Sequence, residues 1–220
     1  MADLKFWLRW VFANGCAELV GLGIVALAAL GLNAQAGGGP GSAAGIVGGA
    51  LLLTGLGGVE GAIVGGFQWL VLRRRLGAVS ARAWILATAI GALAAWALGS
   101  LPSVLMSGSE PPTAPQVMPD EALIGGYAAA LGFTAGMILA YPQWRVLRRH
   151  AAGSALWLPV NGLAWAIAMP IIFAAAGSVP HPANPGRLVG VILATAGLAG
   201  LVVGAVHGAA LVWITRARRP

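Results

Sequence analysis

The stretch GGVEGAIVGGFQWLVLRRR, from Gly57 to Arg75, decides the fold because the chain carries this pattern three times. GFTAGMILAYPQWRVLRRH (132–150) and GLVVGAVHGAALVWITRAR (200–218) align with it without gaps. Residues four apart share one face of a helix, and stripes of small residues are typical of helices that pack closely within a bilayer. The predicted helix-packing positions are Gly57, Gly61, Gly65, Gly132, Gly136, Gly200, Gly204 and Gly208.

The composition of the 220-residue chain indicates an integral membrane protein. Hydrophobic residues make up 59% of it and charged residues 9%, whereas soluble domains contain about 25% charged residues. A membrane helix needs about 20 apolar residues, and six runs of the chain qualify. We therefore expect an all-α fold with six transmembrane helices in a single domain, residues 1–220. The expected spans are 8–32, 44–72, 83–101, 122–146, 155–177 and 188–215, and the expected solvated loops on the outer side are 33–43, 102–121 and 178–187.

The repeat divides the six spans into three tandem two-helix hairpins. Their approximate bounds are 8–75, 83–150 and 155–218. The first helices repeat more faintly: tryptophan precedes an amide or hydroxyl residue by four positions, in the pairs Trp10 and Asn14, Trp84 and Thr88, and Trp157 and Asn161. All three hairpins cross the membrane in the same sense. The sequence therefore predicts pseudo-threefold symmetry about the membrane normal.

Basic residues gather on one side of the predicted membrane. Of the 13 lysines and arginines, all but Arg187 lie at the termini or in the two loops on the terminal side. The positive-inside rule then makes both termini cytoplasmic, and we expect a bacterial inner membrane protein. The net charge of +7 is thus juxtamembrane, which argues against nucleic acid as a partner and for anionic lipid headgroups. The predicted cytoplasmic face for lipid or a partner comprises Gln68, Arg73, Arg74, Arg75, Gln143, Arg148, Arg149 and Arg216.

Three ionisable side chains lie inside the predicted spans: Glu18, Glu60 and His207. At 1.5 Å per residue, each lies about 13 Å or more from the nearest arginine of its helix. A charge at this depth costs at least about 2.5 kcal/mol, so such groups face the protein interior or a cavity. They either fix helix register as neutral, hydrogen-bonded groups or handle a proton, cation or ligand, and we expect all three to converge. With two amides on the first and fifth spans, the candidate polar site comprises Asn14, Glu18, Glu60, Asn161 and His207.

Several chemistries are disfavoured by the same residues. The only lysine, Lys5, lies outside the spans, which argues against a retinal protein. No close group of histidine and carboxylate residues predicts a metal site, although His207 alone has the chemistry to bind a pigment or haem as an axial ligand. Six spans with a histidine on the sixth are similar to rhomboid intramembrane proteases, but the segment Gly132 to Gly136 lacks their serine. We therefore expect no enzyme activity.

The tandem G-x3-G-x2-QW-x-VLRR pattern, with FWLRWVFAN at residues 6–14, resembles bacterial multi-pass membrane proteins that are uncharacterised in function. The resemblance covers nearly the whole chain and implies no activity. Our leading hypothesis is a non-enzymatic accessory or scaffold subunit that packs against other membrane subunits through its glycine-rich helix faces. The alternative is a small transporter of protons, cations or small molecules that uses Glu18, Glu60 and His207.

Overall fold

The computed structural model describes residues 1–35, 42–106, 120–179 and 184–216, and this part of the chain is helical with no strand. Six long helices are apolar enough to cross a membrane, which confirms the predicted all-α membrane fold. They are α1 (Ala2–Gln35), α2 (Ala43–Leu72), α3 (Ala81–Met106), α4 (Glu121–Leu147), α5 (Trp157–Gly177) and α6 (Pro185–Arg216), with a short 3₁₀ helix η1 (Ser154–Leu156) before α5.

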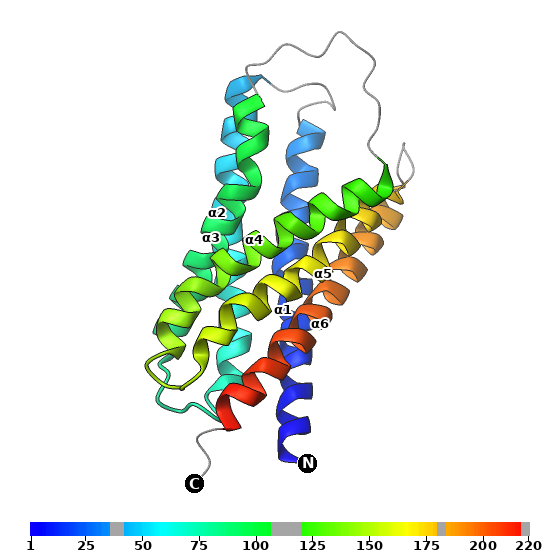
Figure 1. Ribbon diagram of the computed structural model, residues 1–220. Coiled ribbons are helices and arrows are strands. Elements are labelled where there is room, and N and C mark those ends of the chain that lie inside the picture. The colour runs from blue at the N-terminus through cyan, green and yellow to red at the C-terminus, as the bar shows by residue number, and fades with distance from the viewer. Residues whose placement is uncertain (36–41, 107–119, 180–183, 217–220) are drawn as a thin grey trace.

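The six helices form a closed ring. Each packs against its two neighbours in the chain, and α6 packs against α1. In Figure 1, α4, α5 and α6 run obliquely across the first three helices, and the start of α1 lies at the same end of the bundle as the end of α6. We call this the basic end, because the arginines that follow α2 and α4 and the last residue of α6 lie there. The other end is called the far end.

Two helices extend beyond the predicted spans by five residues or more at one end. Helix α1 begins at Ala2, six residues before its expected start, and α3 continues through Pro102 to Met106. Hydropathy marks the part of a helix that crosses the bilayer, whereas backbone hydrogen bonding continues into polar flanks. The predicted outer loops fall largely on residues that the structure does not describe, and at their described margins Ser42 and Asp120 cap the first turns of α2 and α4.

The glycine stripes pack between successive hairpins. Those of α2, α4 and α6 lie against α3, α5 and α1, respectively. A Cβ atom added at Gly136 would lie 2.5 Å from the Asn161 carbonyl oxygen, and one at Gly204 would lie 2.9 Å from Asn14 Cβ. At every predicted packing glycine, the space that a Cβ atom would take is filled by another helix of the same chain. The expectation that these faces contact other subunits is therefore wrong.

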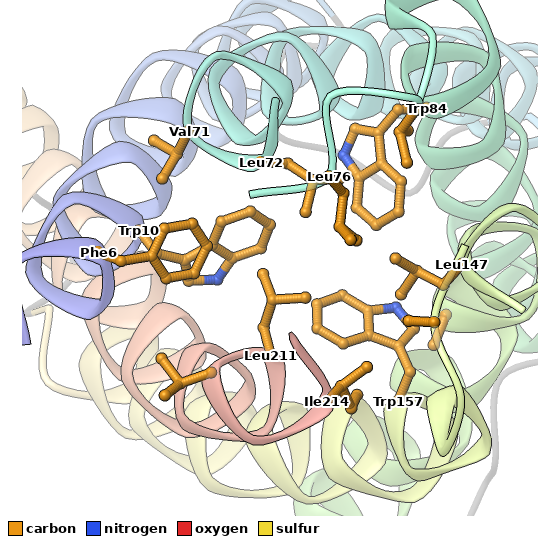
Figure 2. Close-up of a cluster of buried hydrophobic side chains, with 14 residues drawn as sticks. Phe6, Trp10, Val71, Leu72, Leu76, Trp84, Leu147, Trp157, Leu211 and Ile214 are labelled. Atoms are coloured by element: carbon orange, nitrogen blue, oxygen red, sulfur yellow. The ribbon is translucent and has the colours of Figure 1, made fainter. Parts of the chain in front are cut away.

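A cluster of large apolar side chains closes the basic end. Trp10, Trp84 and Trp157 come from α1, α3 and α5 and have no exposed surface. Figure 2 shows their rings directed inward, around Leu76 and Leu211. Burial of aromatic rings on this scale dominates packing energetics. The three tryptophans that mark the repeat in the sequence therefore form the centre of the buried cluster at the basic end.

Candidate functional site

Each of the three buried tryptophans donates its indole N–H to a side chain on a neighbouring helix. Trp84 Nε1 bonds to Gln68 Oε1 at 3.2 Å, and Trp157 Nε1 bonds to Gln143 Oε1 at 2.9 Å. The third copy of the repeat has leucine where the other two have glutamine. There, Trp10 Nε1 bonds instead to His207 Nδ1, at 2.8 Å. His207 thus serves as the acceptor that the third repeat would otherwise lack.

The amide and hydroxyl residues of the repeat connect these pairs into a network. Asn14, Thr88 and Asn161 each donate to the carbonyl oxygen of the tryptophan four residues earlier. Gln68 Nε2 donates to Asn14 Oδ1 at 2.8 Å, and Gln143 Nε2 donates both to Gln68 Oε1 at 3.1 Å and to Thr88 Oγ1 at 2.9 Å. All of these side chains are buried. The network joins four helices, α1 to α4, and holds Trp157 of α5.

Burial corrects the sequence-based assignment of the two glutamines. Gln68 is 2% exposed and Gln143 is fully buried, so neither belongs to a face for lipid or a partner. They lie one turn inside the arginine clusters on the inward side of their helices, where amides form interhelical hydrogen bonds. Asn14 and Asn161, predicted as candidate site residues, are likewise members of this internal network.

The arginines of the predicted face lie at the basic end, where Arg73, Arg74, Arg148, Arg149 and Arg216 are exposed. Arg73 and Arg148 each lie over the tryptophan four residues earlier, with the guanidinium carbon about 5 Å from the ring centroid, at 4.9 and 5.1 Å. Arg75 is more enclosed: it pairs with Asp3 and donates to Thr215 Oγ1 at 3.0 Å. Arg216 also pairs with Asp3, at 2.8 Å. These pairs tie the start of α1 to the ends of α2 and α6.

Glu18 and Glu60 form a second polar cluster, nearer the far end. Their carboxyl groups lie close enough to interact electrostatically, and the two residues are only 2% and 5% exposed. Trp96 Nε1 of α3 donates to Glu60 Oε2 at 2.6 Å, whereas Glu18 Oε2 is buried without a hydrogen-bond partner. Within the described part of the chain, the bond from Trp96 to Glu60 is therefore the one hydrogen bond that this pair receives from another side chain.

Glycines provide the space for both carboxyl side chains. A Cβ atom on Gly21 of α1 would lie 2.7 Å from Glu60 Cγ, and one on Gly200 of α6 would lie 2.8 Å from Glu18 Cβ. No larger residue fits at either position without displacing a glutamate. The backbone around the pair is thus shaped to bring two acidic side chains together inside the membrane span.

His207 does not join the two glutamates, so the expected convergence is only partly correct. Gly200, which contacts Glu18, precedes His207 by seven residues, about 10 Å along α6. The imidazole instead packs between the rings of Trp10 and Trp157, with centroids 5.7 and 5.2 Å away. The residue is 1% exposed and its Nδ1 is already an acceptor. The space around His207 therefore does not fit the pigment or haem ligation considered from the sequence.

An apolar cavity adjoins the carboxyl pair. Its volume is about 260 Å³, side chains of α1, α2, α3, α4 and α5 line it, and Glu60 is the only ionisable residue among the described residues of its lining. A second cavity, of about 560 Å³, shares the walls Leu22, Trp96 and Ile172 with the first. Its lining continues to the far ends of the helices, at Leu30 and Leu188. Volumes of 300–1,000 Å³ with mostly apolar walls and few polar groups are typical of small-molecule sites.

Sequence reasoning missed Trp96, although the repeat contained a signal for it. Extending the alignment of the three tryptophans by 12 residues pairs Trp96 with Leu22 and Met169. All three line the smaller cavity. The positions aligned with Glu18, namely Ala92 and Trp165, line it as well. The repeat register therefore identifies the inward-facing positions at this depth, and two of the three copies are apolar there.

The described residues contain no group of three histidine, cysteine or acidic side chains arranged to hold a metal ion. Comparisons with protein-family models, with curated proteins and with solved structures each found no match.

Proposed function

We propose that this protein is a membrane carrier that binds a small, mostly apolar solute beside the Glu18 and Glu60 pair. The main support is the apolar cavity, where Glu60 is the only ionisable residue within the described part of the lining. A buried carboxyl inside a membrane span is costly and is retained where it serves a function. Here that group lines a cavity of about 260 Å³, which shares walls with the larger cavity of about 560 Å³. This favours the transporter hypothesis over a purely structural role.

A carrier fits better than a channel. The tryptophan cluster and the glutamine network close the basic end, while the larger cavity has a lining that reaches the far ends of α1 and α6. A conducting pore needs a path through both ends. A carrier in one of its two states has a site that is reached from one side only. Here the basic end is closed and the lining of the larger cavity extends toward the far end.

The accessory-subunit hypothesis keeps the exposed arginines as a surface for a partner but not the glycine stripes. The glycine faces that were expected to bind other subunits are filled by α3, α5 and α1 of the same chain. Exposed leucines, isoleucines and phenylalanines cover the outside of the bundle, as lipid contact requires of any membrane protein. We therefore propose the carrier function and no enzymatic activity.

Orientation and symmetry complete the proposal. We propose that the basic end faces the cytoplasm of a bacterium, because lysine and arginine concentrate there, and that the cavity faces the opposite side of the inner membrane. The exposed arginines would contact anionic headgroups. The three Trp-to-acceptor bonds and the three glycine contacts support a pseudo-threefold relation of the hairpins about the membrane normal.

The test fills the cavity by substitution. Ala95 lines the smaller cavity, whereas its neighbour Ala94 is exposed on the outside of α3. Ala95→Leu should abolish protein-dependent exchange of hydrophobic solutes in liposomes, and Ala94→Leu should leave it unchanged. The assay uses a panel of labelled neutral, cationic and anionic solutes with the purified full-length chain. If no solute exchanges faster with the native protein than with Ala95→Leu, the carrier proposal is wrong.

A further inference from the structure

We propose that the solute is a lipophilic cation, an organic molecule with one positive charge and an aromatic or alkyl body, which the Glu18 and Glu60 pair binds in exchange for a proton. This inference rests on the carrier function and specifies its substrate class. It follows from the charges, the donors and the walls of the two cavities.

The ionisable groups at the site are all acidic. Among the residues that the structure describes, the linings of both cavities contain no lysine, arginine or histidine, and Glu60 is their only acidic residue. The titratable group that faces Glu60 from α1 is Glu18, α3 presents Trp96, and the lining residues of α4, α5 and α6 carry no titratable side chain. An anionic solute would find no positive partner here. A cationic solute would find two carboxyl groups.

The carboxyl pair has an oxygen atom without a hydrogen-bond donor, and a cation or a proton would satisfy it. Of the described residues, only Trp96 supplies an N–H to the pair from another side chain, and Glu18 Oε2 is buried without a partner. Two ionised carboxylates in contact repel each other, and in a membrane span the repulsion is poorly screened. The empty pair is therefore stable only with a proton. One proton leaves as one monovalent cation enters, so the net charge of the site stays constant.

The apolar lining of the cavities favours an organic cation over an inorganic one. Inorganic cations such as Ca²⁺ and Mg²⁺ require about six oxygen ligands, whereas the linings offer the Glu60 carboxylate and the Thr195 hydroxyl. The remaining wall is aliphatic or aromatic, and it includes the rings of Trp96, Trp165 and Phe173. Aromatic faces attract organic cations such as quaternary ammonium groups. An alkyl or aryl cation therefore satisfies both the charge and the surface of the site.

The experiment compares two probes of the same shape and opposite charge, tetraphenylphosphonium and tetraphenylborate. Binding is measured on the full-length protein in nanodiscs of zwitterionic lipid. The native protein should bind tetraphenylphosphonium saturably, and Ala95→Leu should abolish that binding. Glu60→Gln should weaken it at least tenfold. Lowering the pH should weaken it by up to about tenfold per unit, because one proton competes for the pair. The pH series needs no variant, so it tests the inference even if Glu60→Gln does not fold.

Two results would overturn the cation assignment while leaving the carrier proposal intact. The first is equal, Ala95→Leu-sensitive binding of tetraphenylborate. The second is tetraphenylphosphonium binding that changes neither with pH nor in Glu60→Gln. By contrast, failure of every solute in the liposome panel would remove the carrier function itself, and the substrate class with it.

Discussion

Adding one methyl group to a packing glycine should separate two helices, and Gly136 in α4 is the sharpest position for this test. The new Cβ atom of Gly136→Ala would lie 2.5 Å from the Asn161 carbonyl oxygen, and an ordinary contact begins at 3.4 Å. The helices must therefore move apart locally by about 0.9 Å, the difference between these two distances. The opposing atoms belong to the backbone of α5 and cannot rotate away. Overpacking of this kind costs about 1–3 kcal/mol, and we expect the upper end of that range.

Gly66 provides the matched control because an added Cβ atom would meet nothing within 4 Å. Gly66→Ala should be neutral or stabilise the helix by about 0.5 kcal/mol. Gly58 is intermediate, since its nearest neighbour is the flexible Leu93 side chain at 3.3 Å. The predicted order of stability is Gly66→Ala, then Gly58→Ala, then Gly136→Ala. The first and last should differ by about 3 kcal/mol, which is roughly a hundredfold in the unfolding equilibrium.

The assay is reversible unfolding in mixed micelles with increasing SDS, followed by the fluorescence of the nine tryptophans. All three variants are single-methyl additions on α2 or α4, so differences in chemistry do not enter. If Gly136→Ala unfolds within about 0.5 kcal/mol of Gly66→Ala, the close packing of α4 against α5 is not as described.

Three further predictions concern the polar contacts. Gln143→Leu removes three hydrogen bonds and should cost about 2 kcal/mol in the same unfolding assay, at roughly 0.6 kcal/mol per bond, whereas Thr134→Val, which removes an exposed bond within one helix, should cost little. Asp3→Asn breaks two ion pairs at the basic end and should cost no more than about 1 kcal/mol, a loss that high salt removes. His207→Gln keeps an acceptor for Trp10 and should retain solute exchange in liposomes, whereas loss of exchange in a folded His207→Gln would assign His207 a role in transport.

The spacing of residues in the sequence predicted the packing geometry well. Glycine at every fourth position identified faces that lie against another helix, because only small residues allow that approach. The sequence did not reveal which helix fills each face. A stripe that contacts a neighbour in the same chain looks the same in sequence as one that contacts another subunit. The packing of α2 against α3, of α4 against α5 and of α6 against α1 decides between these two cases.

The polar residues were predictable as buried but not in their grouping. Glu18, Glu60 and His207 all lie inside spans, yet their clustering depends on helix rotation and tilt, which hydropathy does not report. His207 lies apart from the glutamates and accepts the hydrogen bond of the Trp10 indole. Glutamine does this in the other two repeats, and Leu211 stands at its position in the third. Gln68 and Gln143 were assigned to the predicted surface because they are close in sequence to the arginine clusters. About one turn of helix is enough, however, to separate a buried amide from an exposed guanidinium.

The most direct test of the central claim is cysteine accessibility from each side of the membrane. The native Cys16 is replaced by alanine, and single cysteines are placed at Ala29 and Ala95 in the cavity linings and at Ala210, which is buried near the basic end. A membrane-impermeant trimethylammonium methanethiosulfonate is then added to sealed vesicles of either orientation. We expect Ala29→Cys and Ala95→Cys to react only from the side opposite the arginine clusters, and Ala210→Cys to react from neither side. Reaction of Ala95→Cys from the arginine side, or from neither side, would contradict a solute site that opens at the far end of the bundle.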